Sequence, residues 1–245
     1  MPATPAWPPR SLPRLFVPKV LEQGMDVELD GAPAHYLANV LRLKAEAEVL
    51  MFDGVSGEWL ANIVLARKGS LVLQVQSKTR DAETVPDVAL AFAPVKRAQT
   101  DWLVEKATEL GAARLIPVTT QRTVADLVKI ERLPSISIEA AEQSGRTILP
   151  DICEPVSLRQ LLENDGRRLY FADENGGQPA RSAFVPGPAT ILIGPEGGFS
   201  DQERIAIRAT PHAVAISLGP RILRAETAAL AALTVYMALA GDWQS

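Results

Sequence analysis

Residues 191–200 read ILIGPEGGFS, an apolar strand that runs into a turn with three glycines. Ser200 and Glu203 have the spacing of a capping box, which predicts that a helix begins at Ser200. Ligands of open α/β sheets bind at the carboxyl ends of parallel strands, and glycine there permits close approach of a ligand to the backbone. We therefore predict a ligand-binding loop, with a plain tight turn before a helix as the alternative.

A second strand, turn and helix follow at residues 216–228, which read ISLGPRILRAETA. Arg224 and Glu226 lie near the predicted start of this helix and are candidates for chemistry. Their plainer interpretations are a solvated surface charge for Arg224 and a favourable carboxylate in the first helical turn for Glu226. The apolar side chains of the turn are expected to form a slot for a flat ring: Leu218, Ile222 and Leu223.

Neither loop has a phosphate-binding pattern. The sequence contains no GxxxxGKS or GxxxxGKT string and no GxGxxG string. The ligand of these loops is therefore expected to be held by contacts other than those to a phosphate group. A nucleotide-dependent oxidoreductase becomes a distant alternative.

The two loops belong to a region in which short apolar strands alternate with helices, a pattern that predicts a parallel α/β sheet. The expected strands are 88–93, 115–118, 169–171, 190–193 and 214–218, and the expected helices are 97–110, 136–144, 158–162 and 225–240. Gly111 is expected as the residue that ends the first of these helices.

The preceding region is predicted to be a small β module with one short helix. Its expected strands are 14–17, 48–52, 58–65 and 71–76, with a helix over 34–43 between the first two. A polar stretch separates the two regions. The predicted division is a β-barrel domain over 1–78 with a proline-rich N-terminal tail, a linker over 79–85 and an α/β domain over 86–245.

Composition indicates a globular protein of 245 residues, since 47% of them are hydrophobic. The single cysteine, Cys153, excludes an internal disulfide and is expected to be an incidental apolar residue. No secretory signal or run of 18 apolar residues is present, so we expect a cytoplasmic protein without a membrane span. The net charge of −4 argues against a broadly basic RNA-binding surface. No metal is expected.

Two further helical strings carry charged side chains. Residues 101–111 read DWLVEKATELG, whose charges have an ordinary solvated face as their alternative interpretation. Residues 139–146 read EAAEQSGR, in which Glu139 and Glu142 share one helix face.

Together with HYLANVLR at residues 35–42, these strings resemble the RsmE family of ribosomal RNA methyltransferases, within the SPOUT, or trefoil-knot, superfamily. They occur in the family's order and span nearly the whole chain. GPEGG alone is modestly specific, whereas GPEGG followed by LGxRILRAETA is highly specific. Two departures stand out. The family often has paired histidines where this chain has His35–Tyr36, and a more basic string with glycine where it has Lys96–Thr100.

The resemblance implies a parallel-sheet SPOUT domain with a deep trefoil knot, preceded by a small PUA-like β-barrel that helps to bind RNA. It implies methylation of N3 of a uridine in small-subunit (16S) ribosomal RNA, with S-adenosylmethionine as methyl donor. It also implies a homodimer with the active site at its interface, and the assembled 30S subunit as substrate. The alternatives are a SPOUT methyltransferase with another RNA target and a non-catalytic RNA-binding or ribosome-assembly protein.

The resemblance also implies the site residues. Residues that would hold the cofactor are Ala172, Asp173, Ile193, Gly194, Pro195, Glu196, Gly197, Gly198, Leu218, Gly219, Ile222, Leu223, Arg224 and Thr227. Residues that would contact RNA are Arg14, His35, Arg42, Lys96, Arg97, Lys106 and Arg146. Because uridine N3 must lose a proton, we hypothesise that Arg224 stabilises the developing negative charge. Glu142 or Glu226 would take the proton. The target base would have to leave any stack.

Overall fold

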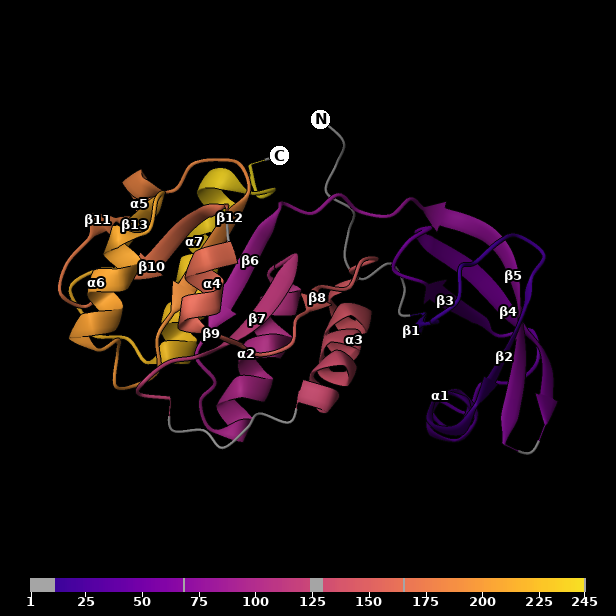
Figure 1. The fold of residues 1–245 in the computed structure, drawn as a ribbon. Coiled ribbons are helices and arrows are strands. Elements are labelled where there is room, and N and C mark those ends of the chain that lie inside the picture. Colours follow the sequence, from indigo (N-terminus) through magenta and orange to yellow (C-terminus); the bar gives the residue numbers. More distant parts are fainter. Residues whose placement is uncertain (1–11, 68, 124–129, 165, 245) are drawn as a thin grey trace. The chain divides into compact units, whose positions relative to one another are not determined.

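The computed structural model describes residues 12–67, 69–123, 130–164 and 166–244 (Figure 1). They form two compact units. The N-terminal unit comprises the chain up to Glu83 together with Ala141–Ile148, and the C-terminal unit comprises Thr84–Ala140 and Leu149 onward. Residues 1–11 of the expected proline-rich tail, and Lys68 between the strands expected over 58–65 and 71–76, lie outside the described residues.

In its described residues, the N-terminal unit has one sheet of five strands in the order β1-β3-β4-β5-β2. These strands are β1 (Arg14–Phe16), β2 (Asp26–Asp30), β3 (Glu48–Phe52), β4 (Glu58–Arg67) and β5 (Ser70–Arg80). β1 pairs with β3 in parallel, and the other pairs are antiparallel. Alternate residues such as Ala61 and Ile63 of β4 are fully buried in the core of the unit. The predicted small β module is confirmed.

The helix of this unit differs from the single helix expected over 34–43. It begins earlier as α1 (Gly31–His35) and continues as a π-helical turn over Tyr36–Val40. The turn closes with a hydrogen bond from Leu41 N to Tyr36 O of 2.9 Å. Arg42 follows with a φ of +55°, which ends the helical path. This wider turn keeps Leu37 fully buried while Tyr36 stays exposed.

In the C-terminal unit, the described residues form a parallel sheet in the order β11-β13-β10-β12-β6-β7-β8, with β9 paired to β7. The strands are β6 (Val88–Phe92), β7 (Arg114–Thr119), β8 (Asp151–Ile152), β9 (Val156–Ser157), β10 (Arg168–Ala172), β11 (Gln178–Pro179), β12 (Ala189–Ile193) and β13 (Ala213–Ser217). The predicted parallel sheet is confirmed. β10 lies between β12 and β13, so the carboxyl ends of these three strands meet at one edge.

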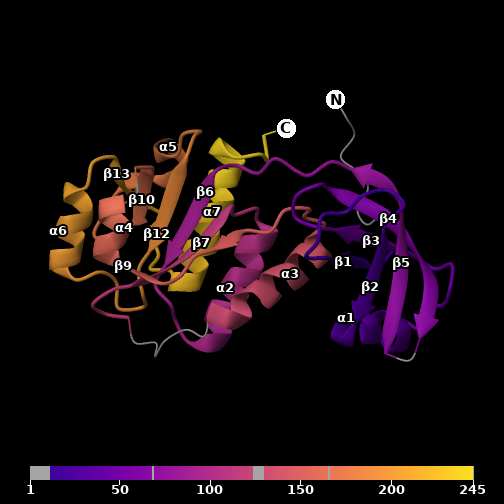
Figure 2. The same cartoon turned by 45° about the vertical axis from the view of Figure 1, so that its right-hand side comes forward.

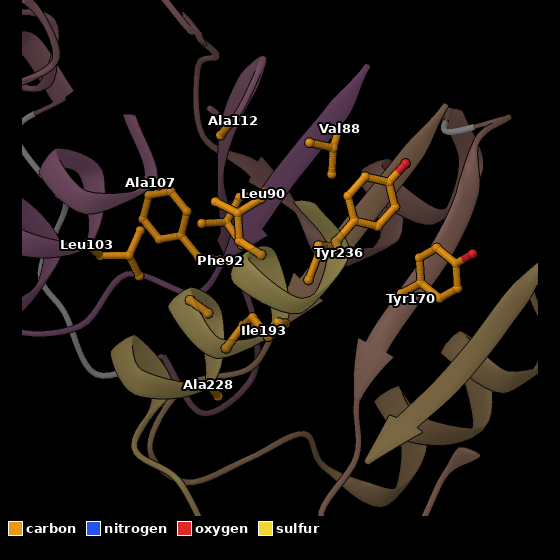
Figure 3. Packing of buried hydrophobic residues seen from close by; sticks show 14 of the residues in the cluster. Val88, Leu90, Phe92, Leu103, Ala107, Ala112, Tyr170, Ile193, Ala228 and Tyr236 are labelled. Carbon is orange, nitrogen blue, oxygen red and sulfur yellow. The ribbon is translucent and has the colours of Figure 1, made fainter. Parts of the chain in front are cut away.

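Helices cover both faces of this sheet (Figures 1 and 2). They are α2 (Arg97–Glu109), α3 (Leu133–Ser144), α4 (Leu158–Asn164), α5 (Ala180–Ala183), α6 (Asp201–Ala209) and α7 (Ala225–Ala240), with a 3₁₀ turn over Ile130–Arg132. Alternate residues of β6 enter opposite cores. Val88, Leu90 and Phe92 pack with α2, α5 and α7, whereas Ala89 and Ala91 pack with α4 and α6. Figure 3 shows the first core, with Leu103 of α2 and Tyr236 of α7 beside β6.

Some expected boundaries were wrong. β2 was missed because Val27 and Leu29 are its only apolar residues, too few for a clear alternating pattern. The expected linker over 79–85 begins inside β5, because Arg80 still pairs with Glu58 of β4. β8, β9 and β11 have two residues each, too short for a sequence pattern.

The trefoil knot depends on which loop of the chain passes through which. The strand order does not determine this threading, so the knot stays a prediction.

Candidate functional site

The loops that follow β10, β12 and β13 enclose a cavity of about 470 Å³ in the C-terminal unit. Every residue predicted to hold the cofactor lines this cavity except Thr227, which is exposed on α7. Three stretches that are far apart in the sequence are therefore brought together, as the strand order requires. The lining also includes residues that are absent from the set predicted to hold the cofactor: Glu174, Gly176, Phe199, Ile216, Ser217, Pro220, Arg221, Ala225 and Ala228.

The floor of the cavity is apolar. Ile193 and Ile216 are buried at the ends of β12 and β13, and Ala228 contributes a small buried side chain from the start of α7. Leu223, one of the residues predicted to form a slot for a flat ring, is partly buried and packs against the core of the unit. Ile222, predicted for the same slot, is 92% exposed, so it lies on the rim of the cavity and leaves apolar surface open to a ligand.

The wall contributed by β12 is a tight turn whose glycines are needed for different reasons. Gly198 donates its N–H to Pro195 O at 2.8 Å and has a φ of +64°, a conformation that favours glycine. A Cβ atom on Gly198 would lie 2.7 Å from Oε1 of Glu174 in the neighbouring loop. A Cβ atom on Gly194 would lie 3.2 Å from the ring of Phe199. Backbone therefore forms much of this wall.

Helix α6 begins directly after this turn, as predicted. Ser200 is its N-cap, and Ser200 and Glu203 form both hydrogen bonds of a capping box. The buried Glu203 carboxylate accepts from Ser200 N at 2.9 Å and, through its other oxygen, from Gln121 N at 2.7 Å. One carboxylate thus fixes the helix start and the loop that follows β7.

The next residue of α6, Arg204, binds the loop after β10. Its guanidinium pairs with Asp173 and, at 3.0 Å, with Glu174. Burial alone lowers the pKa of Arg204, but the hydrogen bond to Glu174 and the charge of Asp173 outweigh it and raise this pKa. Arg208 also donates to Asp173, at 2.6 Å. The carboxylate of Asp173 is therefore occupied by α6, although Asp173 also lines the cavity.

The two candidates for chemistry at α7 have different surroundings. Arg224 is the N-cap residue, is exposed and lines the cavity. Glu226 lies in the first turn of α7 and is half-buried, outside the cavity lining. The N-terminal end of α7 carries partial positive charge, which adds to that of Arg224.

Glu142, the third candidate for chemistry, lies in the N-terminal unit. Its Oε1 accepts a hydrogen bond from Phe16 N at 3.0 Å. Arg14 of the same strand donates to the backbone carbonyls of Ala141 and Glu142 at 2.7 and 3.0 Å. The structure does not place Glu142 at the cavity. It places it in the hydrogen bonding between β1 and the end of α3.

A buried carboxylate completes this arrangement. Glu58 pairs with Arg14 at 2.7 Å and with Arg80 at 3.0 Å. Burial alone raises the pKa of Glu58, but the hydrogen bonds and charges of Arg80 and Arg14 outweigh it and lower this pKa. Arg80 also donates to Gly145 O.

The residues predicted to contact RNA fall into three groups. His35, Arg42, Lys96 and Arg97 are exposed. Lys106 pairs with Glu105 and Glu109 at 2.7 and 2.8 Å, and these hydrogen bonds raise its pKa. Arg14 and Arg146 are only 8% and 4% exposed, which leaves their guanidinium groups little surface for a partner.

Three further findings concern metal binding, membrane spanning and the single cysteine. Within the described residues, no group of three or more His, Cys, Asp or Glu side chains is arranged to hold a metal ion. No helix in the described part of the chain is long and apolar enough to cross a membrane. Burial and the nearby charge of Asp151 raise the pKa of Cys153, which is the opposite of what an activated thiol requires.

Both regions of the chain match family models. Residues 82–237 match a model described as an RNA methyltransferase domain, and residues 29–76 match one described as an RNA methyltransferase PUA domain.

Relatives and solved structures agree with these models. The ribosomal RNA small subunit methyltransferase E of Rickettsia conorii is 32% identical, over 90% of this chain and 93% of that protein. A methyltransferase from Legionella pneumophila, solved with bound S-adenosylmethionine, has a TM-score of 0.89 and 30% identity over 95% of this chain and 99% of that one. The methyltransferase E of Neisseria gonorrhoeae, also solved with this cofactor, has a TM-score of 0.87 and 28% identity over 95% and 100%. The chain therefore belongs to the ribosomal RNA small subunit methyltransferase E, or RsmE, family of RNA methyltransferases.

Proposed function

We propose that this protein transfers a methyl group from S-adenosylmethionine to N3 of a uridine in small-subunit (16S) ribosomal RNA. The observation that carries the proposal is the cavity itself, in which three loops of the parallel sheet bring thirteen of the fourteen predicted cofactor residues together. Family membership supports the cofactor and the class of RNA. The choice of N3 of uridine follows from the resemblance of the sequence motifs alone.

The lining of the cavity suits S-adenosylmethionine, which has a flat adenine, a ribose and a charged amino-acid end but no phosphate. Ile216, Leu218, Leu223 and Ala228 supply an apolar surface for adenine, and the glycine turn offers backbone groups to polar atoms. When bound, the sulfonium centre of this cofactor supplies an electrophilic methyl group, so no metal is needed.

The residues of this chain would then orient the uridine and accept the proton that its N3 loses. Arg224, exposed on the rim of the cavity, would donate hydrogen bonds to a uracil carbonyl oxygen and stabilise negative charge as N3–H is lost. Glu226 or Glu142 would accept the proton. Glu226 lies two residues beyond Arg224, whereas Glu142 already accepts from Phe16 N. These surroundings favour Glu226.

The first measurement is a calorimetric titration with S-adenosylmethionine of the wild-type protein and of Gly197→Trp. Loss of binding in the variant alone supports the cavity as cofactor site. Methyl transfer to small subunits is then measured, with 3-methyluridine identified by mass spectrometry of nucleosides. Absence of cofactor binding by the wild-type protein would favour the non-catalytic RNA-binding alternative, and a different methylated nucleoside would favour another RNA target.

Arg224→Ala tests the proposed role of the cation. We expect kcat at saturating cofactor to fall about a hundredfold, the scale of losing one donor to a developing oxyanion. Cofactor is kept saturating because Arg224 is also among the residues proposed to hold it. Arg159→Ala is the control, because that arginine is 86% exposed on α4 and pairs with Glu163 of the same helix. Unchanged turnover in Arg224→Ala would contradict the role.

We further propose that residues 1–78 contact RNA and that residues 86–245 carry the methyl transfer, joined by a linker that begins only after β5 ends at Arg80. RNA contact is kept for the exposed His35 and Arg42, and for Lys96 and Arg97 at the start of the second region. Arg14 and Arg146 are buried, and Lys106 is paired with two glutamates. The substrate would be the assembled 30S subunit in the cytoplasm, because a chain of net charge −4 is expected to bind naked RNA weakly. Faster methylation of free RNA than of 30S subunits would contradict this.

A homodimer is proposed as the active form. Trp102 on α2 and Leu239 on α7 are 43% and 39% exposed, and α7 is rich in alanine, which permits close helix packing. Light scattering after gel filtration measures the mass directly. A monomer at working concentration would contradict the proposal.

A further inference from the structure

We propose that Arg122, which lies outside the predicted site, is a positioning residue for the cofactor loop. Its Nη1 donates a hydrogen bond of 2.7 Å to the carbonyl oxygen of Gly197, which lines the cavity. By holding this carbonyl, Arg122 keeps the turn Pro195–Gly198 in the conformation that receives the cofactor. This inference rests on the proposed function, because it concerns the shape of the same cavity.

The peptide group between Gly197 and Gly198 is held from both sides. Its N–H donates to Pro195 O at 2.8 Å, and its C=O accepts from Arg122. Two successive glycines leave this peptide unusually free to reorient, because neither has a Cβ atom. Without Arg122 one of the two restraints is lost. Part of the binding free energy of the cofactor must then be used to order the turn.

Arg122 is itself projected from a firmly held turn. The carboxylate of Glu203, which is 8% exposed, accepts from the N–H of Gln121 at 2.7 Å. The turn is closed by a hydrogen bond from Thr120 N to Thr123 Oγ1 of 3.0 Å. Since Glu203 also holds the N-cap of α6, the turn of Arg122 and the end of the glycine loop are fastened to the same helix.

The aliphatic part of the Arg122 side chain also lies close to Gly197 in the glycine turn. A Cβ atom on Gly197 would lie 3.4 Å from Cδ and 3.6 Å from Cβ of Arg122, ordinary contact distances. Because Arg122 is exposed, its replacement leaves no buried charge without a partner. The expected effect is therefore on the turn and not on folding of the unit.

Calorimetric titration with S-adenosylmethionine tests the inference in the full-length protein. We expect Arg122→Ala to bind about tenfold more weakly than wild type, the scale of one hydrogen bond to a charged group. Arg122→Lys should recover part of this loss, and the control Arg159→Ala should bind as wild type. In the methylation assay, KM for the cofactor should rise while kcat at saturation stays close to wild type.

Two outcomes separate this inference from the proposed function. Failure of the wild-type protein to bind the cofactor would contradict the proposed function. Normal affinity in Arg122→Ala, beside a wild-type protein that binds, would overturn the role of Arg122 alone.

A double-mutant cycle with Gly197→Ala tests the mechanism. The backbone of Gly197 is outside the left-handed region, so alanine is tolerated and restricts the turn. If Arg122 acts by limiting the freedom of this turn, Arg122→Ala should weaken binding less in the Gly197→Ala background than in wild type. Hydrogen exchange of the Gly198 amide without cofactor should also be faster in Arg122→Ala. An equal loss of affinity in both backgrounds with unchanged exchange would contradict positioning.

Discussion

At the residue scale, Gly197 and Gly198 are neighbours with different requirements. Gly198 has a φ of +64°, and a Cβ atom there would lie 2.7 Å from Glu174 Oε1, whereas Gly197 has neither constraint. We expect Gly198→Ala to lower the free energy of unfolding by about 1–2 kcal/mol, the scale of a strained left-handed residue, and to weaken cofactor binding. Urea denaturation and calorimetry measure the two effects. Gly197→Ala is the matched control, and equal effects of the two substitutions would contradict this account.

Thirteen of the fourteen residues predicted to hold the cofactor line one cavity, because the elements that flank them along the chain determine where they lie. Strand, glycine turn and helix follow one another at Gly194–Gly198 and at Leu218–Arg224, so the loops had to lie at the carboxyl edge of a parallel sheet. The surroundings of Glu142 could not be predicted in this way. One partner of its side chain, the backbone N–H of Phe16, is 126 residues away in the sequence. Arg14 was predicted to contact RNA, and its burial could not be predicted because its partners, such as the carbonyl of Ala141, are similarly distant in the sequence.

At the element scale, α6 organises the cavity through two consecutive residues of opposite charge. Glu203 holds the loop after β7, and Arg204 holds the loop after β10. We expect Ser200→Ala to cost about 1 kcal/mol in the free energy of unfolding, as for other N-cap residues. Glu203→Ala should cost more, about 2–3 kcal/mol, because the N–H groups of Gln121 and Ser200 both lose their acceptor. Urea denaturation of both variants checks the order, and a smaller loss for Glu203→Ala would contradict it.

Element boundaries followed the sequence where a chemical signal marks them. α6 begins directly after Ser200, the N-cap residue of its capping box, and α7 spans the predicted Ala225–Ala240. The π-helical turn at Tyr36–Val40 has no comparable signal in the sequence, and it places Leu37 in the buried core of the unit. β5 extends beyond its expected end, since its last residues pair with β4 although their side chains are polar.

At the scale of the whole molecule, the N-terminal unit is assembled from two separate stretches of chain. The stretch ending at Glu83 and the segment Ala141–Ile148 are joined by buried polar groups. Arg14 and Arg80 both donate to backbone carbonyls of the segment, and Glu58 lies between the two arginines. We therefore expect an ionised Glu58 to stabilise this unit.

The ionised carboxylate of Glu58 predicts how the stability of the folded protein depends on pH. The pKa of Glu58 is lower in the folded protein than the ordinary glutamate value of about 4.3. The contribution of Glu58 to the free energy of unfolding is therefore fully present above a pH of about 4.3. It is lost as the pH falls through the folded pKa, because the carboxyl must then be protonated. Hydrogen bonds from Ser56 and backbone N–H groups outweigh burial and lower the pKa of Asp53 too, so some acid sensitivity remains without Glu58.

Glu58→Gln should consequently be less stable at pH 7, by about 3 kcal/mol, because Arg14 loses its buried counter-charge. The difference between wild type and variant should shrink as the pH is lowered below about 4.3, since protonation makes the wild-type side chain neutral as well. Scanning calorimetry from pH 7 to acid follows both proteins. Glu28→Gln, an exposed glutamate on β2, is the control. A difference that stays constant across this range would show that charge on Glu58 contributes nothing, and that the side chain acts through its shape and hydrogen bonds alone.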